Sequence, residues 1–463
     1  MVGTELRDRR QLLGLSQAKL SELSGISQHL LSAFELDKAV LPAALLDTLV
    51  SALSDTTQVV TLAKRNKRYQ DHKYVGVPKL ADRVGRASCT AGNQEYRHVL
   101  GEIATQHRQE QNRGLSALSL FSGGGGFSLG FSAAGFGVKA FLEVDEGLRG
   151  IYKENFPHSL ALGGDITAVD RQALLAFAKR LGSVDVIIGG PPCQGFSLAG
   201  KRNVDDPRNE LFKHYLRFVD VLRPKVAVLE NVRLLTSMRS ASGSLVKDDV
   251  CDSFREHGYN VKCFEMNAKE YGVPQHRERV LFVAMRSDLG LLPGLPDCTH
   301  GECLGLGLFS SVLPYRTFGD ACSDLPYIES GESSDDPLHV AVRHPAHVIE
   351  WLWDVPEGRS AHDNADQSKR PPSGYNTTYK RQVWAEPAGT VQTTFGMISG
   401  CRNVHPIATR SLTIREAARV QSFPDTYRFV GNAGTIRTGI GNAVPPLLAY
   451  RIAQYLERRL QSL

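Results

Sequence analysis

The chain has 463 residues, 42% of them hydrophobic and 22% charged, so it is long enough for two or three globular domains. Its net charge of +5 permits nucleic-acid binding but does not require it. The eight cysteines form no CxxC pair, which excludes the usual zinc sites and disulfide frameworks. No apolar run is long enough to span a membrane, and the N-terminus lacks the apolar core of a signal peptide. We expect a cytoplasmic protein with reduced thiols and no metal site.

The first 35 residues carry apolar side chains at roughly helical spacing. Ser16 and Ser27 are suited to cap two helices, and Ser24-Gly25 is suited to break the chain between them. A helix, a glycine turn and a second capped helix are the parts of a helix-turn-helix. Residues 1–75 are therefore predicted to form an all-α helix-turn-helix domain. A helical bundle that serves only dimerisation is the alternative.

This N-terminal segment resembles the repressor-like helix-turn-helix family, including the Ser-Gln pair that begins the second helix. The resemblance implies that Gln28, His29 and Ser32 face the major groove of DNA. A basic run then follows between residues 64 and 73, and it is either a solvated face or a phosphate contact. Residues 76–114 are polar and weakly patterned, which predicts a linker with some helix.

From Leu115 onward, strand patterns and helix patterns alternate. Short apolar strands are predicted over residues 117–121, 139–144, 184–188, 226–229 and 280–284. Amphipathic helices lie between them, for example over 171–181 and 210–222. This βαβ rhythm predicts an α/β fold with a doubly wound, Rossmann-like parallel sheet.

The composition changes again at about residue 287. Residues 287–410 are rich in Gly, Pro, Ser, His and Asp and have only short apolar runs, which predicts a small irregular domain. Strong helical patterns return over 413–421 and 446–460. The α/β domain is therefore expected to be interrupted by this irregular domain and then completed by the C-terminal helices.

Three successive strand ends carry residues suited to an adenosine-like ligand. The first strand ends in a glycine run that begins a GxGxxG pattern at Gly123, although Ser128 replaces the last glycine. Glu143 ends the second strand and suits the hydroxyls of a ribose. Asp165 follows in the next segment and suits an adenine amino group. Each acid alone is as easily a helix cap or a surface group, but the ordered set favours a ligand site.

Cys193 lies in the sequence Gly-Gly-Pro-Pro-Cys-Gln-Gly-Phe-Ser, directly after the strand predicted over 184–188. Prolines restrict the backbone, and open α/β sheets place their chemistry at the carboxyl ends of their strands. A buried structural cysteine is the alternative. Glu230 ends another strand, while Arg277 and Arg279 precede the last one, so a carboxylate and two guanidinium groups are available as partners.

The chain resembles the DNA (cytosine-5)-methyltransferases of bacterial restriction–modification systems. The resemblance covers roughly residues 115–460 apart from the irregular insert, and it is carried by ordered motifs at 121–126, 143–145, 164–166, 191–194, 206–211, 230–232, 275–279, 415–424 and 441–446. It implies a catalytic domain over 115–286 and 411–463, with a target-recognition domain over 287–410. It also implies S-adenosyl-L-methionine as cofactor and double-stranded DNA as substrate.

In this family a cysteine thiolate adds to carbon 6 of a cytosine that has been flipped out of the duplex, and this addition activates carbon 5 for methylation. The resemblance therefore makes Cys193 the nucleophile and Glu230 the contact to ring N3. It makes Arg279 the contact to the ring oxygen and Arg277 the residue that orients Glu230. The cofactor pocket is implied to consist of Phe121, Ser122, Gly123, Gly125, Glu143, Val144, Asp165, Ile166, Pro191, Leu211, Asn442 and Val444.

Two positions depart from the family pattern. Ser119 stands where an aspartate is usual, and Val144 stands where a bulkier residue often packs against the adenine. Neither residue touches the reacting groups, so we expect at most a weaker affinity for the cofactor.

Contacts to DNA are predicted in the insert at Arg381 and Thr393, with Thr390 and Thr394 as further candidates. The catalytic unit is expected to be a monomer associated with the nucleoid, protecting DNA from a cognate restriction enzyme. The N-terminal domain is expected to repress its own promoter, and the sequence leaves open whether it dimerises on an operator. An inactive DNA-binding regulator and an RNA cytosine methyltransferase on the same fold are the alternatives.

Overall fold

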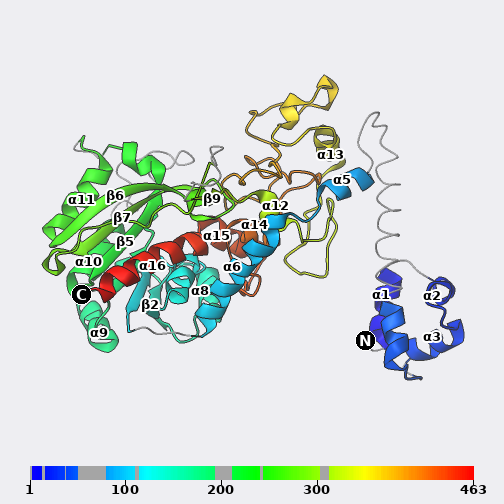
Figure 1. Cartoon of the computed structure of the whole chain (residues 1–463), viewed down its shortest axis with the longest axis horizontal. Helices are drawn as coiled ribbons and strands as arrows, with labels where there is room; N and C mark the ends of the chain where they lie inside the picture. Colours follow the sequence, from blue (N-terminus) through cyan, green and yellow to red (C-terminus); the bar gives the residue numbers. More distant parts are fainter. Residues whose placement is uncertain are drawn as a thin grey trace. The chain divides into compact units, whose positions relative to one another are not determined.

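The computed structural model describes residues 3–12, 16–36, 38–50, 80–109, 114–192, 211–239, 243–302 and 312–463 (Figure 1). The chain divides into two compact units, Met1–Arg86 and Ala87–Leu463. We call them the N-terminal unit and the main unit and describe each by itself. No helix within the described ranges combines the length and apolar character needed to cross a membrane.

The described part of the N-terminal unit is entirely helical. It contains α1 (Gly3–Leu12), α2 (Gln17–Ser24), α3 (Gln28–Glu35), a helix over 43–50, and α5 (Leu80–Arg86). Ser16 and Ser27 cap α2 and α3 as predicted, since their hydroxyls accept hydrogen bonds from the backbone N–H groups of Lys19 and Leu30, three residues later. Gly25 ends α2 in the left-handed conformation, with φ of 68°.

The helices of this unit enclose a small core and one buried ion pair. Leu20, Leu31 and Phe34 are among the buried apolar residues. Arg10 donates two hydrogen bonds, of 2.6 and 2.7 Å, to the carboxylate of Glu35. Gln17 donates a third to the same carboxylate at 2.8 Å. These bonds tie α1 and the start of α2 to the end of α3.

Within the described residues, the main unit is built on a seven-stranded sheet in the order β3-β2-β1-β4-β5-β7-β6. The strands are β1 (Ser116–Leu120), β2 (Gly137–Leu142), β3 (Leu160–Ala161), β4 (Val186–Gly189), β5 (Val226–Val232), β6 (Tyr259–Asn267) and β7 (Glu278–Arg286). The first five pair in parallel. The order reverses between β1 and β4, which is where open sheets of this kind bind their ligands.

The prediction of a parallel sheet is wrong for its last strand. β7 runs antiparallel to β5 and to β6, a strand that the sequence pattern did not reveal. The reason is the connection from β6 to β7, which covers residues 268–277 and contains one short 3₁₀ turn, η5 (Ala268–Tyr271). A parallel return needs a longer crossover, usually a helix, so this connection produces an antiparallel pair.

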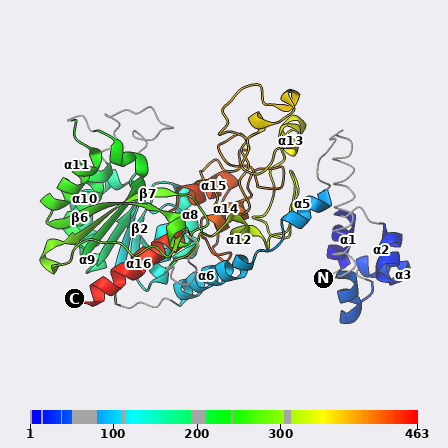
Figure 2. The ribbon, with the colours of Figure 1, turned by 45° about the horizontal axis from the view of Figure 1, so that its top comes forward.

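Helices cover both faces of the sheet (Figures 1 and 2). The core on one face is shared with α6 (Ala91–Arg108), α7 (Gly126–Ala133), α8 (Glu146–Asn155) and α16 (Pro446–Gln461). The core on the other face is shared with α9 (Arg171–Leu181), α10 (Leu211–Leu222) and α11 (Val246–Glu256). Side chains alternate along the strands, since Val228 of β5 belongs to the first core and Leu229 to the second.

Helix α6 lies in the segment that was predicted to be a linker, and it corrects that prediction. Its Tyr96, Leu100 and Ile103 are buried in the first core. The Tyr96 hydroxyl also donates a 2.6 Å hydrogen bond to the carbonyl of Arg419. The helix therefore belongs to the main unit, although its many polar residues concealed the narrow apolar stripe that packs.

Residues 287–410 are mostly irregular, in agreement with their composition. In the part that the structure describes, 287–302 and 312–410, the regular elements are short: β8 (His300–Gly301), β9 (Leu313–Pro314), α12 (Phe318–Cys322), α13 (Ala346–Trp353) and three 3₁₀ turns, η6 (Ser287–Leu289), η7 (Ala361–Asp363) and η8 (Gln367–Lys369). We call this stretch the irregular segment. It is followed by α14 (Ile414–Val420) and α15 (Ala433–Asn442), which lead into α16.

Candidate active site

The loop after β1 contains the predicted glycine run. Phe121, Gly123 and Gly125 all have positive φ, of 53°, 55° and 89°. Phe121 is the strained member, because a side chain disfavours this conformation. The Ser122 hydroxyl donates to the carbonyls of Ser119 and Leu142, which joins the loop to the end of β2.

Glu143 connects the ends of β1 and β2. Its carboxylate accepts hydrogen bonds from the backbone N–H of Gly123 at 2.7 Å and of Asp145 at 2.9 Å. The side chain is buried, and this burial raises the pKa of the carboxyl above its usual value. Val144 beside it is 67% exposed, so an apolar surface lies open next to a carboxylate.

The third strand end is less tightly built. Asp165 is exposed and caps η1 (Ile166–Ala168), accepting a hydrogen bond from Thr167 N–H that lowers the pKa of its carboxyl. Ile166 is buried in the second core, below this surface.

Arg149 of α8 joins the ends of the second and third strands, a role that no motif in the sequence had indicated. Its Nη1 donates to the carbonyls of Glu143 at 3.0 Å and Val144 at 2.7 Å. The same atom lies 2.9 Å from the place that a β-carbon on Gly164 would occupy. Its position six residues after Glu143, on the helix that follows, was the only signal for it in the sequence.

Glu230 and Arg279 form an ion pair, with Arg279 Nε 2.8 Å from Glu230 Oε1. Both side chains are nearly buried. Oε2 of Glu230 also lies 3.1 Å from where a β-carbon on Gly190 would stand, so the backbone after β4 passes directly over the carboxylate. Asn231 donates from Nδ2 to the carbonyl of Pro191 at 3.1 Å.

These contacts bring the residues before Cys193 against the end of β5. Pro191 is buried, while Cys193 itself lies outside the described residues. Leu211, the first residue of α10, is half-buried beside the second core.

Arg277 does not orient Glu230, which corrects the sequence-based prediction. Its guanidinium donates to the carbonyl of Val391 at 3.2 Å and to that of Gly441 at 3.0 Å. The side chain is 1% exposed, and burial lowers its pKa well below the usual value. Residues two apart, such as 277 and 279, point to the same side of a strand only when both belong to it. Because β7 begins at Glu278, Arg277 lies before the strand and its side chain takes another direction.

The C-terminal segment closes over the glycine loop. Tyr427 donates from its hydroxyl to the carbonyl of Gly124 at 2.5 Å. The carbonyl oxygen of Val444 lies 2.6 Å from where a β-carbon on Gly126 would stand. Val444 is buried and Asn442 is exposed, at the end of α15. The C-terminal residues therefore complete the α/β unit, as the sequence predicted, and they do so against the glycine loop.

Arg381 does not face DNA, which corrects a second prediction. The side chain is 1% exposed, and it donates to the carbonyls of His405, Ile407, Ala408 and Leu352. It therefore holds the irregular segment together from inside. A sequence gives no signal that separates such a buried arginine from a surface one.

The other predicted DNA contacts are at least partly accessible. Thr393 is half-buried, and its backbone nitrogen lies 2.4 Å from where a β-carbon on Gly441 would stand. Thr394 and Thr390 are exposed, and the Thr390 hydroxyl donates to the carbonyl of His276. In the N-terminal unit Gln28 and His29 are exposed at the start of α3, and Ser32 is half-buried.

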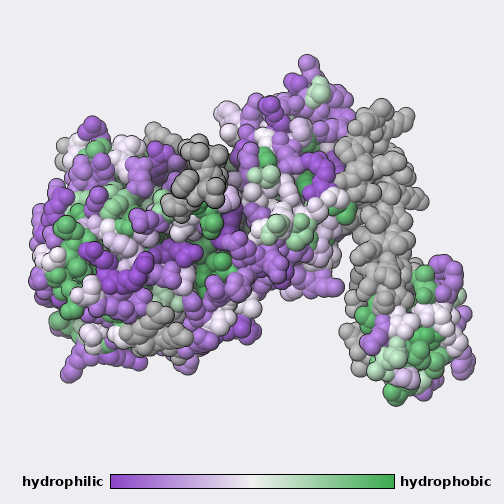
Figure 3. Space-filling view, in the orientation of Figure 1, coloured by the Kyte–Doolittle hydropathy of each residue, from purple (hydrophilic) through white to green (hydrophobic). Residues whose placement is uncertain are grey.

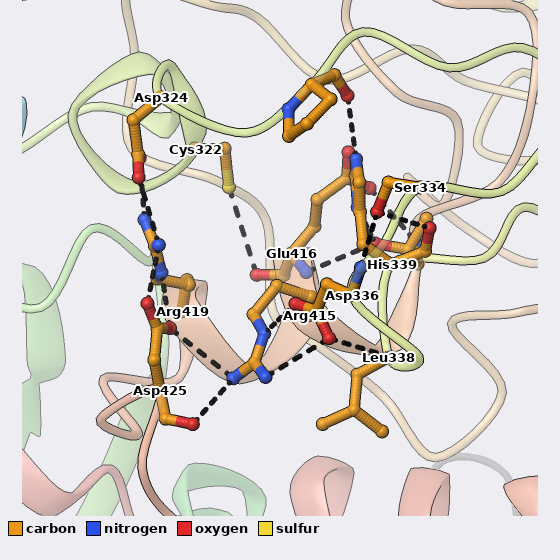
Figure 4. Close-up of polar contacts among 12 residues, drawn as sticks. Cys322, Asp324, Ser334, Asp336, Leu338, His339, Arg415, Glu416, Arg419 and Asp425 are labelled. Atoms are coloured by element: carbon orange, nitrogen blue, oxygen red, sulfur yellow. Dashed lines mark hydrogen bonds and ion pairs between the residues drawn. The ribbon is translucent and has the colours of Figure 1, made fainter. Parts of the chain in front are cut away.

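Figure 4 shows how α14 anchors the irregular segment. Arg419 makes paired hydrogen bonds to Asp324 and to Asp425, with N–O distances of 2.6 to 3.0 Å. Arg415 binds Asp336 at 2.5 Å. Glu416 accepts two hydrogen bonds from the buried guanidinium of Arg410, at 2.7 and 2.8 Å. The motif at 415–424 is therefore structural, linking α14 to two acids of the irregular segment.

The fold of the main unit is similar to that of solved DNA methyltransferases. It resembles the crystal structure of a putative DNA modification methyltransferase encoded within a prophage of E. coli, with a TM-score of 0.58 and 27% identity, over 75% of this chain and 99% of that one. The main unit thus has an α/β methyltransferase fold with a mixed sheet.

The sequence profile of the C-5 cytosine-specific DNA methylases matches residues 115–458, and the chain belongs to this family. It is 38% identical to the Type II methyltransferase M1.HphI of Haemophilus parahaemolyticus, over 73% of this chain and 86% of that protein. It is 35% identical to M.DdeI of Desulfomicrobium norvegicum, over 73% and 88%. The chain is therefore a DNA cytosine methyltransferase.

Proposed function

We propose that this enzyme flips one cytosine of a specific sequence out of duplex DNA and methylates its carbon 5, protecting the DNA from a cognate restriction enzyme. The observation that carries the proposal is the ion pair of Glu230 and Arg279, which lies directly under Gly190 and beside Pro191. Cys193 follows two residues later. On this proposal the Cys193 thiol acts beside the carboxylate of Glu230 and the guanidinium group of Arg279.

These residues divide the reaction into easier steps. The Cys193 thiolate adds to carbon 6 of the cytosine, while Glu230 binds ring N3 and Arg279 binds the ring oxygen. Addition makes carbon 5 a nucleophile. After methyl transfer, carbon 5 loses its proton and the carbon–sulfur bond breaks, which restores the aromatic ring and frees the thiolate. The target must leave the helix first, because carbon 6 is enclosed in a duplex.

S-adenosyl-L-methionine, which the family and fold imply, supplies an electrophilic methyl group when it is bound. The residues at the ends of β1 and β2 are suited to bind this cofactor. Glu143 accepts two backbone N–H groups, and a carboxylate has about four acceptor positions, so about two remain for ribose hydroxyls. Val144 offers an exposed apolar face to an adenine, and a β-carbon on Gly123 would meet nothing within 4 Å.

The proposal is tested with tritiated cofactor on duplex DNA and on tRNA. We expect methylation of DNA only, and loss of turnover in Cys193→Ala with DNA binding retained. Cys401→Ala, at an exposed cysteine, is the matched control and should remain active. Residual methylation by Cys193→Ala, or methylation of tRNA, would contradict the proposal. Bisulfite sequencing of DNA from an expressing host identifies the methylated sequence, and digestion with candidate restriction enzymes tests protection.

For the N-terminal unit we propose a separate function, binding of an operator at its own promoter. The support is local: α2, the left-handed Gly25 and the capped α3 follow in the order of a helix-turn-helix, and Gln28 and His29 are exposed at the start of α3. The double variant Gln28→Ala/His29→Ala should lose promoter binding and keep methylation. Glu22→Ala, exposed on α2, is the control and should keep both.

A further inference from the structure

Tyr375 stands out in the irregular segment because its side chain is 80% exposed. Among the described residues it is the only aromatic side chain in the set of exposed large hydrophobic residues. The surface around α13 of the irregular segment is mainly hydrophilic (Figure 3). The ring therefore offers an open, flat aromatic face on which another planar group can stack.

The backbone that carries this ring is fixed by hydrogen bonds. The N–H and the hydroxyl of Thr378 both donate to the carbonyl of Tyr375, each at 2.8 Å, and the first of these bonds closes a four-residue turn. Asn376 donates from Nδ2 to Asp363 Oδ1 at 3.1 Å. The turn is therefore bound to η7 on one side and closed on itself on the other.

Gly374 lets the turn lie close to η7. Its φ is 130°, and a β-carbon there would lie 2.9 Å from His362 Nε2 and 3.1 Å from Thr378 Oγ1. His362 Nε2 and Thr378 Oγ1 are hydrogen-bonded at 3.2 Å. Because the support is rigid, the Tyr375 ring loses little conformational freedom when it binds a partner.

The charges near this turn do not favour a phosphate clamp. Lys369 pairs with Asp354 at 3.0 Å and lies 3.9 Å from Asp366. Arg370 donates its Nε to the carbonyl of Asn364. Since nearby acids and carbonyls already engage these cations, the distinctive group that the turn offers to DNA is an aromatic face.

We propose that Tyr375 is a DNA-contacting residue whose ring stacks on bases of the duplex substrate. The inference rests on the proposed function, methylation of duplex DNA, and on the irregular segment acting as the target-recognition domain that its resemblance implies. Aromatic side chains stack on every base, and they do so most readily where the duplex is unstacked, as it is beside a flipped nucleotide. The ring provides affinity for opened DNA through its face and makes no contact with phosphate.

The test uses the full chain and a duplex oligonucleotide carrying the sequence found by bisulfite sequencing. Tyr375→Ser should raise the Kd and the KM for this DNA about tenfold, with the KM for S-adenosyl-L-methionine unchanged. Tyr375→Phe should stay within about twofold of the wild type, because stacking needs the ring and not the hydroxyl. The slope of log Kd against log salt should be the same for all three proteins, since no phosphate contact is lost.

Leu292→Ser is the matched control, because Leu292 is another exposed apolar residue of the irregular segment, at 71%. It should bind DNA like the wild type. Unfolding midpoints should not change in any of these variants, which separates lost contact from lost folding. Wild-type affinity in Tyr375→Ser would overturn the inference, and so would an equal loss in Tyr375→Phe. An inactive wild type would instead contradict the proposed function.

Discussion

Arg279 Nε lies 2.8 Å from Oε1 of Glu230, and this ion pair joins the start of β7 to the end of β5. In the register of these strands Val232 lies opposite Arg279 and Leu281 opposite Glu230, so the paired side chains are diagonal neighbours. The pairing depends on the antiparallel direction of β7. A parallel strand would place its first residues at the opposite edge of the sheet, away from the carboxyl ends.

Removing either member of this pair should lower kcat/KM, and removing both should lower it little further. We expect Glu230→Gln and Arg279→Met each to lower kcat/KM about 10²-fold, because in the proposed mechanism each side chain contacts the base and also orients the other. A double-mutant cycle under single-turnover conditions measures the coupling.

The control for this cycle is Arg233→Met. Arg233 pairs with Glu265 and Glu278 near the same strands, but its side chain is 56% exposed, so little activity should be lost. If the losses of the two active-site variants simply multiplied in the double variant, the two residues would act independently and the proposed coupling would be wrong.

Arg149 should act on cofactor affinity alone. Arg149→Gln removes the two bonds that hold the carbonyls of Glu143 and Val144, so the carboxylate and the apolar face lose their fixed relation. We expect the KM for S-adenosyl-L-methionine to rise about tenfold, a loss of about 1.4 kcal/mol, with the KM for DNA unchanged. Lys153→Gln, exposed on the same helix, should change neither constant. A rise confined to the KM for DNA would contradict this role.

The sequence predicted the ends of β1, β2 and β4 to within two residues, because each is a short apolar run followed closely by a glycine or an acid. The predicted ends of β5 and β7 fall three and two residues too early. The sequence also predicted the caps at Ser16 and Ser27, whose hydrogen bonds are local. Such features depend on residues a few positions apart, where propensity and pattern decide the structure.

The errors concern relations between distant residues. The burial of Arg381 depends on carbonyls of residues 405–408. The direction of the Arg277 side chain depends on the carbonyls of Val391 and Gly441, to which it donates hydrogen bonds. Nothing within a few residues of either arginine distinguishes it from a surface arginine. The direction of β7 likewise depends on β6, a half-buried strand whose pattern did not stand out. Tertiary packing decided each of these cases.

The close approach of α7 and α16 should tolerate no added side chain. A β-carbon on Gly130 would lie 2.4 Å from both Ala449 Cβ and Tyr450 N. We expect Gly130→Ala to lower the free energy of unfolding by about 1–3 kcal/mol and to weaken cofactor binding, because α16 follows the segment that covers the glycine loop. Urea denaturation and calorimetry provide the two measurements.

Gly101→Ala in α6 is the matched control. A β-carbon there would meet nothing within 4 Å, so the variant should gain about 0.5–1 kcal/mol from helix propensity. Equal stability of the two variants would show that α7 and α16 can move apart without cost.

The buried charges under the irregular segment should make the main unit sensitive to acid. Burial alone would raise the pKa of the Glu416 carboxyl, but the charge and hydrogen bonds of Arg410 outweigh it and hold this pKa well below its usual value. Nearby His405, 3.7 Å from Glu416, has a pKa that burial lowers well below normal. Burial also lowers the pKa of His344 to about 4.

In each of these groups the folded pKa lies below the unfolded one, so the unfolded state binds more protons as the pH falls. The histidines should begin to reduce stability below about pH 6.5, and Glu416 should add to the loss below about pH 4.3.

A plot of the free energy of unfolding against pH should therefore show two acid slopes, one from the histidines and a second from Glu416. Glu416→Gln should remove part of the second slope only. At pH 7 the variant should be less stable by about 3–5 kcal/mol, because Arg410 is 1% exposed and loses its carboxylate partner. Glu386→Gln, at an exposed acid, should leave both slopes intact. Urea denaturation of the full chain between pH 4 and 8 measures these changes, and an unaltered acid slope in Glu416→Gln would assign the loss to other carboxylates.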